Sequence, residues 1–236
     1  MKLYEECIQR TEKALDGLAH IVVKPEYGWP DEGKNQLIFQ DETAYELGGQ
    51  GKPALSMTLF TDAEFDDSIE IYGNDLEKIT GDCAFARLAI VSVEDETLGT
   101  GNTLYQNLCR VEYVRYHLNP EGYMMRISPK DQREGVRVSK AALASGLSFA
   151  KVGSAFLSAY HRIPCVKHVR LIFMTQESVP IEELTLIAQR SKEITTALDH
   201  LVKNVKMDCQ TCGLKKICAE VQEMCAEEFK EEKESV

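Results

Sequence analysis

The chain has 236 residues, of which 44% are hydrophobic, and its 38 acidic and 27 basic side chains give a formal net charge of −11. A chain of this length can bury a full hydrophobic core in one domain with an appendage. Binding to a nucleic-acid backbone requires clustered Lys and Arg, so the acidic balance argues against nucleic acid as the main partner. No stretch approaches the ~20 apolar residues that span a bilayer, and the acidic start lacks the apolar run of a signal peptide. We therefore expect a cytoplasmic protein with no membrane partner.

The first half of the chain predicts a helix followed by short strands. Apolar residues recur at helical spacing over Leu3–Val22, and the two Pro and two Gly of KPEYGWPDEGKN then predict a linker. Short apolar runs separated by Gly and Asp clusters come next and predict strands. These runs are Gln36–Phe39, Ala54–Phe60, Ser68–Tyr72 and Phe85–Val93.

The second half alternates helices with strands. The turn TLGTGN leads into a predicted helix over Thr103–His117, and Ser139 is a plausible N-cap for a short helix after the predicted strand Val136–Val138. The later elements are a helix over Phe149–Arg162, a strand over Val169–Met174 and a helix over Ile181–Lys206. The pattern predicts a mixed α/β fold, with a single mixed-sheet domain flanked by helices and a small helical C-terminal appendage. The expected units are residues 1–35 (helix and linker), 36–178 (α/β domain) and 179–236 (helix, cysteine-rich segment and acidic tail).

The eight cysteines fall into two groups. Four are scattered, and we expect them to be small core residues; they are Cys7, Cys83, Cys109 and Cys165. The other four lie within one short segment, and such a cluster in a reducing compartment indicates metal ligands. They are Cys209, Cys212, Cys218 and Cys225.

The clustered cysteines have the spacing Cys-x2-Cys-x5-Cys-x6-Cys. Thiolates are soft donors and select zinc, copper(I) or iron–sulfur centres. Structural zinc sites more often have two Cys-x2-Cys knuckles, whereas iron–sulfur proteins favour three close cysteines and a looser fourth. The spacing therefore favours an iron–sulfur cluster, with zinc as the alternative. If residues 219–229 form a helix, Cys218 and Cys225 lie about 10 Å apart along its axis, which is far for one cluster unless the helix begins after Cys218 or bends. Cys7 or another distant cysteine is the alternative fourth ligand.

Several segments resemble one known family. They are DETAYELGGQGKPAL from Asp41, DDSIEIYGNDL from Asp66, and VRVSKAALASGLSFAKVGSAFLSAYHRIPCVKHVRLIFMT from Val136. In their order and spacing they resemble the acetyl-CoA synthase family, the β subunit of the carbon monoxide dehydrogenase/acetyl-CoA synthase complex. The resemblance implies that the α/β domain matches the family's arginine-rich middle domain, which is associated with coenzyme A and with docking of the corrinoid iron–sulfur protein. It also implies that Cys209 and Cys212 open a four-cysteine set that holds a [4Fe-4S] cluster.

The chain departs from the family in three ways. The later cysteines, Cys218 and Cys225, match in order but not in spacing. The family's cluster is bridged to a dinuclear nickel site held by a Cys-Gly-Cys, and this sequence has no Cys-x-Cys. The family's large N-terminal domain is replaced by residues 1–35. We therefore expect no nickel site and no synthesis of the acetyl group.

The middle region has a basic bias within the acidic chain. Arginine forks suit the phosphates of coenzyme A or an acidic partner surface, while a mixed salt-bridged surface is the alternative. The candidate cofactor-binding residues are Arg133, Arg137 and Lys140. The sequence and the resemblance together predict a small [4Fe-4S] protein of anaerobic one-carbon or corrinoid metabolism. It would transfer electrons to, or dock, a corrinoid iron–sulfur protein or another protein of that pathway. The alternatives are an accessory or scaffold protein with a structural zinc or iron–sulfur site, and a coenzyme A-dependent acyl or methyl transferase.

Overall fold

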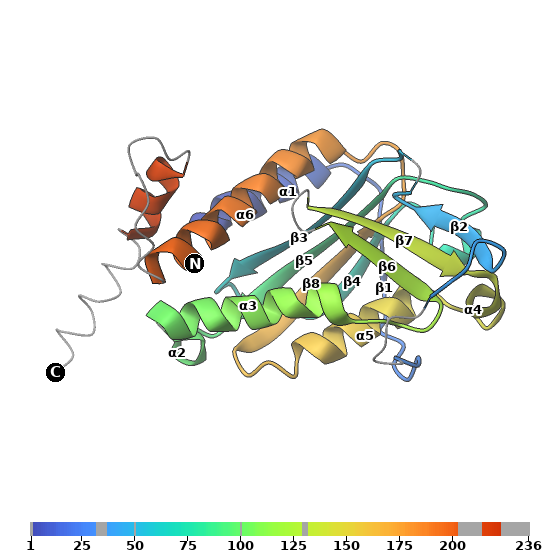
Figure 1. Cartoon of the computed structure of the whole chain (residues 1–236), viewed down its shortest axis with the longest axis horizontal. Coiled ribbons are helices and arrows are strands. Elements are labelled where there is room, and N and C mark those ends of the chain that lie inside the picture. The colour runs from blue at the N-terminus through green and yellow to red at the C-terminus, as the bar shows by residue number, and fades with distance from the viewer. Residues whose placement is uncertain are drawn as a thin grey trace.

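A computed structural model describes the fold for residues 2–31, 37–49, 51–99, 101–128, 132–202 and 214–222. Within these residues the strands form two sheets, one of five strands and one of three (Figure 1). In spatial order the strands of the large sheet are β1 (Ile21–Val23), β4 (Ser68–Tyr72), β8 (Val166–Met174), β5 (Phe85–Val93) and β3 (Ala54–Thr61). The large sheet is mixed, because β4 and β8 run parallel, β3 and β5 run parallel, and the two pairs are antiparallel to each other.

The helices surround the large sheet. They are α1 (Lys2–Leu15), α2 (Asp95–Leu98), α3 (Gly101–His117), α4 (Lys140–Ala144), α5 (Phe149–Tyr160) and α6 (Ile181–Val202), with a 3-10 turn η1 (Leu76–Lys78). A further helix spans residues 215–222. Figure 1 shows α1 and α6 lying side by side, with α3 and α5 on the other side of the large sheet.

Side-chain alternation along the strands places these helices on opposite faces of the large sheet. On one face, Phe173 of β8 stacks on Phe149 of α5 at 4.3 Å between ring centroids. On the other face, the hydroxyl of Thr61 donates to Glu5 of α1 at 2.5 Å. With both faces covered, every residue of the inner strand β5 is buried. The hydrophobic core built this way includes residues from all three units expected from the sequence.

The small sheet has the order β2-β7-β6 and is antiparallel; its strands are β2 (Thr43–Leu47), β7 (Arg133–Ser139) and β6 (Tyr123–Ser128). Strand β7 alternates between two environments. Its inward residues Glu134, Val136 and Val138 are fully buried, whereas Arg133 and Arg137 lie on the outer face.

A buried ion pair joins the two sheets. The guanidinium of Arg87 on β5 donates to both carboxylate oxygens of Glu134 on β7, at 2.9 and 2.6 Å, and both side chains are almost completely buried. The same guanidinium lies 4.1 Å from the ring centroid of Phe156 and donates to the backbone oxygen of Arg115. Arg115 in turn donates to the hydroxyl and the backbone oxygen of Ser56 on β3. This network fixes α3 and both sheets to one another.

The mixed α/β class predicted from the sequence is confirmed, with the strands divided between two sheets rather than one. Five strands coincide with or contain the predicted ones, namely β3, β4, β5, β7 and β8. The predicted helix over Leu3–Val22 is wrong in its second half. It ends at Leu15 because Gly17 adopts a φ of +74°, and residues 21–23 then pair with β4 as strand β1. Residues 37–39 form no strand, and residue 36 lies outside the described ranges.

Among the described residues, no helix is both long and apolar enough to cross a membrane.

Candidate functional site

The helix over 215–222 carries Cys218, the one clustered cysteine that falls within the described residues. Ile217 and Val221, four residues apart on this helix, are buried in the core. The carboxylate of Glu220 accepts a hydrogen bond from Arg190 of α6 at 2.6 Å. These contacts hold the helix against the body, and the thiol of Cys218 lies half-buried at its edge.

The position of Cys218 inside this helix bears on the fourth ligand. The backbone N–H of Cys218 donates to the oxygen of Leu214 at 2.8 Å, so the helix begins before Cys218 rather than after it. One of the two conditions under which Cys218 and Cys225 could reach the same cluster is therefore not met. The other condition, a bend beyond residue 222, and the positions of Cys209, Cys212 and Cys225 lie outside the described residues.

The scattered cysteines behave differently from one another. Cys7 and Cys165 are buried in the core, as predicted, while Cys83 and Cys109 are half-buried. Burial raises the pKa of the Cys7 thiol to about 11, which disfavours a thiolate there. Within the described ranges no group of three or more His, Cys, Asp or Glu side chains is arranged to hold a metal ion.

The candidate cofactor-binding residues share one surface, the outer face of the small sheet and the turn that follows it. Arg137 is engaged by Glu46 of β2, which accepts from its Nε at 2.9 Å, and by the backbone oxygen of Ile38. Arg126 of β6 donates to the second oxygen of Glu46 at 2.6 Å. The ammonium group of Lys140 donates to the backbone oxygen of Asp41.

Glu46 is the anchor of this surface. Burial raises the pKa of its carboxyl, but the hydrogen bonds from Arg137 and Arg126 outweigh burial and hold the pKa below its ordinary value. Glu46 is therefore a charged acceptor at neutral pH. It pairs with Arg126 and with the candidate residue Arg137, and these ion pairs are those of a mixed salt-bridged surface.

Arg133 has a different setting. Its guanidinium donates to the backbone oxygens of Gly48 and Lys52 at 3.0 and 2.9 Å. It also borders a hollow of about 450 Å³. The lining residues are Gly48, Gly49, Arg126, Ile127, Ser128, Arg133 and Gly135. The three glycines have no side chains to fill the hollow, and the two arginines make it basic.

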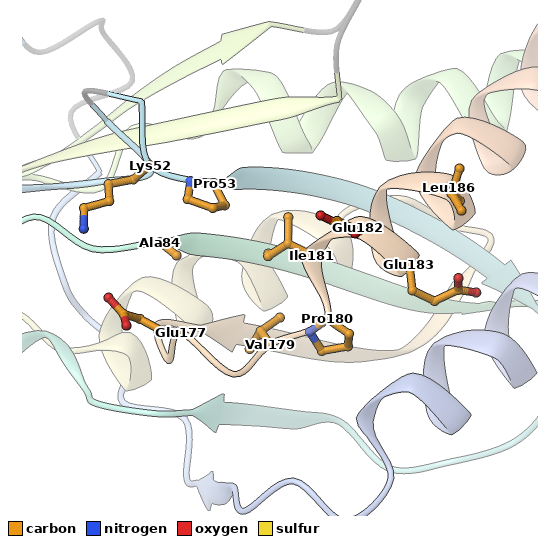
Figure 2. Close-up of a pocket in the computed structure, with 10 residues that line it drawn as sticks. All are labelled: Lys52, Pro53, Ala84, Glu177, Val179, Pro180, Ile181, Glu182, Glu183 and Leu186. Atoms are coloured by element: carbon orange, nitrogen blue, oxygen red, sulfur yellow. The ribbon is translucent and has the colours of Figure 1, made fainter.

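A larger hollow of about 700 Å³ lies where α6 begins, and sequence reasoning missed it (Figure 2). Three segments far apart in the chain meet there: the residues before β3, the residue before β5, and the connection from β8 to α6. Its lining is mainly apolar, with an acidic rim; it consists of Lys52, Pro53, Ala84, Glu177, Val179, Pro180, Ile181, Glu182, Glu183 and Leu186. The available signal was Pro180 followed by two acidic residues, a typical helix start.

The chemistry of this larger hollow is that of a binding surface. Figure 2 shows Lys52 and Glu177 at one end and Glu183 with Leu186 at the other. Its charged lining residues are one lysine and three glutamates, and its other described lining residues are apolar. It suits an apolar group that carries a positive charge.

No model of a known protein family matches the chain, and no curated protein matches it. Its function is therefore argued from the residues themselves.

Proposed function

We propose that this chain is a small iron–sulfur protein whose α/β body docks a partner and whose C-terminal segment holds a [4Fe-4S] cluster. The observation that carries the proposal is the group of four cysteines between residues 209 and 225, one of which, Cys218, is fixed at the edge of the body by a helix with a buried face. A cluster there would be bound to the same rigid element that contacts α6.

The residues that would hold the cluster are Cys209, Cys212 and Cys218, with Cys225 or, in its place, Cys7 as the fourth. When bound by thiolates, such a cluster supplies one-electron exchange, at a potential set by hydrogen bonds and solvent exposure. Cys218 is half-buried, so its thiol is neither locked in the core nor fully in solvent. The exposed side chains of Lys215 and Lys216 on the same helix would offset part of the negative charge of the thiolates.

The resemblance to the acetyl-CoA synthase family, together with the absence of a Cys-x-Cys from the sequence, favours a role in one-carbon or corrinoid metabolism other than making the acetyl group. The partner in this proposal is a corrinoid iron–sulfur protein or another protein of that pathway. The hollow at the start of α6 supports a docking role, because it is open, mainly apolar and acidic at its rim.

Visible spectroscopy of cysteine variants tests the proposal. Anaerobically purified protein should show a broad band near ~400 nm that dithionite bleaches reversibly. The double variant Cys209→Ser/Cys212→Ser should lose the band, and Cys218→Ser should weaken or shift it. The matched control, Cys83→Ser, alters a half-buried cysteine outside the cluster and should keep the wild-type spectrum. A colourless wild-type protein, or equal loss in the control, contradicts the proposal.

A second candidate is favoured by the hollow beside Arg133. Its glycines and arginines suit a phosphate, so coenzyme A binding and a transferase activity rest on this hollow. Retention on immobilised coenzyme A that is lost in Arg133→Gln, but kept in Arg190→Gln, would support the second candidate. Equal retention of both variants would exclude it.

A further inference from the structure

A third hollow, of about 650 Å³, lies on the outer side of α3, against the connection between α5 and β8. Its volume is in the range of small-molecule sites. Residues of α3 form one wall, and the turn after α5 forms the other. The lining consists of Tyr105, Gln106, Cys109, Arg110, Tyr113, Val114, Arg162, Ile163 and Pro164.

The charge of this hollow is opposite to that of the chain. Among the described residues that line it there are two arginines and no carboxylate, although acidic side chains outnumber basic ones by 38 to 27 overall. Both Arg110 and Arg162 are exposed. Burial raises the pKa of the Cys165 thiol, and the positive charge of Arg110 acts in the opposite direction. Arg110 therefore lies close to the α5–β8 connection, which contains both Cys165 and Arg162. Two guanidinium groups facing one hollow are suited to an anion with more than one oxygen, because each presents a planar fork of donors.

An exposed aromatic ring borders the same hollow. Tyr113 is 59% exposed, so its ring is accessible from solvent. One face of its ring stacks on the imidazole of His117, with centroids 3.5 Å apart and planes inclined by 3°. The imidazole holds the phenol ring in one orientation, so the ring is a pre-organised stacking surface at the edge of the hollow. Any nucleic-acid base can stack on such a ring, because every base has a flat aromatic face.

We propose that this hollow binds a nucleoside diphosphate, with the phosphates on Arg110 and Arg162 and the base against Tyr113. Apolar side chains at the floor, including Val114 and Ile163, would contact the sugar and the base edge. The site lies on α3 and the α5–β8 connection, so it shares no residue with the hollow beside Arg133 or with the cysteine segment.

Equilibrium binding of ADP, adenosine and pyrophosphate to the full chain tests this proposal by separating the two halves of the ligand. ADP should bind more tightly than either fragment. Arg110→Gln and Arg162→Gln should each weaken ADP binding by about tenfold, the loss of a charge-assisted hydrogen bond, and should leave adenosine binding unchanged. Tyr113→Ala should weaken ADP binding by about tenfold through lost stacking and should leave pyrophosphate binding unchanged.

The matched control is Arg190→Gln, which removes an arginine that pairs with Glu220 and lines none of the three hollows, and it should leave ADP binding unchanged. Circular dichroism of each variant should match that of the wild type, since the three substituted side chains are exposed. No saturable binding of ADP, or binding that none of the three substitutions weakens, would overturn the proposal. Binding of an acidic peptide in place of ADP would also overturn it, because the arginines would then belong to a protein-docking surface. None of these results depends on whether the chain holds a cluster.

Discussion

At the scale of single residues, the most consequential contact is the buried pair of Arg87 and Glu134. Both charges are removed from water, and the free-energy cost of this is offset by their mutual hydrogen bonds, by the hydrogen bond from Arg87 to the backbone oxygen of Arg115 and by the Phe156 ring. The two residues are 47 positions apart, and neither sequence neighbourhood indicates the pairing. Sequence reasoning therefore could not predict it, since a basic residue in a continuous apolar strand and an acidic residue in a charged one give no signal of their partners.

Removing one member of this pair should be far more damaging than replacing both. Glu134→Ala leaves the Arg87 charge buried without its partner and should lower the free energy of unfolding by about 3–5 kcal/mol. The double variant Arg87→Met/Glu134→Leu fills similar volume without charge and should recover at least about 2 kcal/mol of that loss. Urea titration followed by circular dichroism measures both. A double variant as unstable as Glu134→Ala would show that the charges themselves hold the sheets together.

Glu46 gives a pH-dependent prediction. Its pKa is held below the ordinary 4.5, so its folded state favours the charged carboxylate, and the stability this provides is present above pH 4.5 and is lost as pH falls through the lowered pKa. Glu46→Gln should therefore lower the free energy of unfolding by about 2 kcal/mol near neutral pH, and the difference from wild type should shrink below pH 4.5. The comparison is made by urea titration at several pH values. A difference that grows on acidification would contradict the ion-pair account of the small sheet's outer face.

Buried Cys7 gives a prediction about thiol chemistry. Because burial raises its pKa to about 11, little thiolate forms near neutral pH, and the folded chain should alkylate slowly there. Mass spectrometry after brief iodoacetamide treatment should find Cys7 unmodified in the folded protein and fully modified in urea. Rapid modification of Cys7 in the folded protein would show that α1 detaches from α6.

At the scale of elements, the strands that the sequence predicts best are those with continuous apolar runs. Strands β4 and β5 begin and end at the predicted residues, because buried strands need apolar side chains on both faces. Strand β6 was missed, since YMMRIS shows no clear alternation, and β2 was missed as well. The short helix α4 was predicted by its cap, and the side chain of Ser139 does accept from the N–H of Ala142.

The packing of α5 on β4 depends on a glycine. A Cβ added at Gly153 would lie 2.7 Å from Cδ1 of Ile69, which real contacts essentially never show. Gly153→Ala should therefore lower the free energy of unfolding by about 1–3 kcal/mol, in spite of the higher helix propensity of alanine. The matched control is Gly81→Ala, because nothing lies within 4 Å of its Cβ and its φ is not positive. Thermal unfolding of both variants measures the effect, and equal midpoints would show that α5 can move away from the sheet.

At the scale of the whole molecule, helices cover both faces of one large mixed sheet, and the small sheet extends the hydrophobic core at one end (Figure 1). The motif of four cysteines could be identified from spacing alone. Where this segment lies could not be predicted from the sequence. The helix over 215–222 is held to α6 by the hydrogen bond from Arg190 to Glu220, and these two residues are 30 positions apart. The three hollows have the same origin: each is lined by segments that only the fold brings together.

The central claim is that the C-terminal cysteines hold a [4Fe-4S] cluster, and it is tested most directly by counting iron, acid-labile sulfide and zinc per chain after anaerobic purification. The account predicts about four irons and four sulfides per chain, falling to background in Cys209→Ser/Cys212→Ser and unchanged in Cys83→Ser. One zinc per chain with no sulfide, lost in the same double variant, would contradict it and would leave a structural metal site in its place.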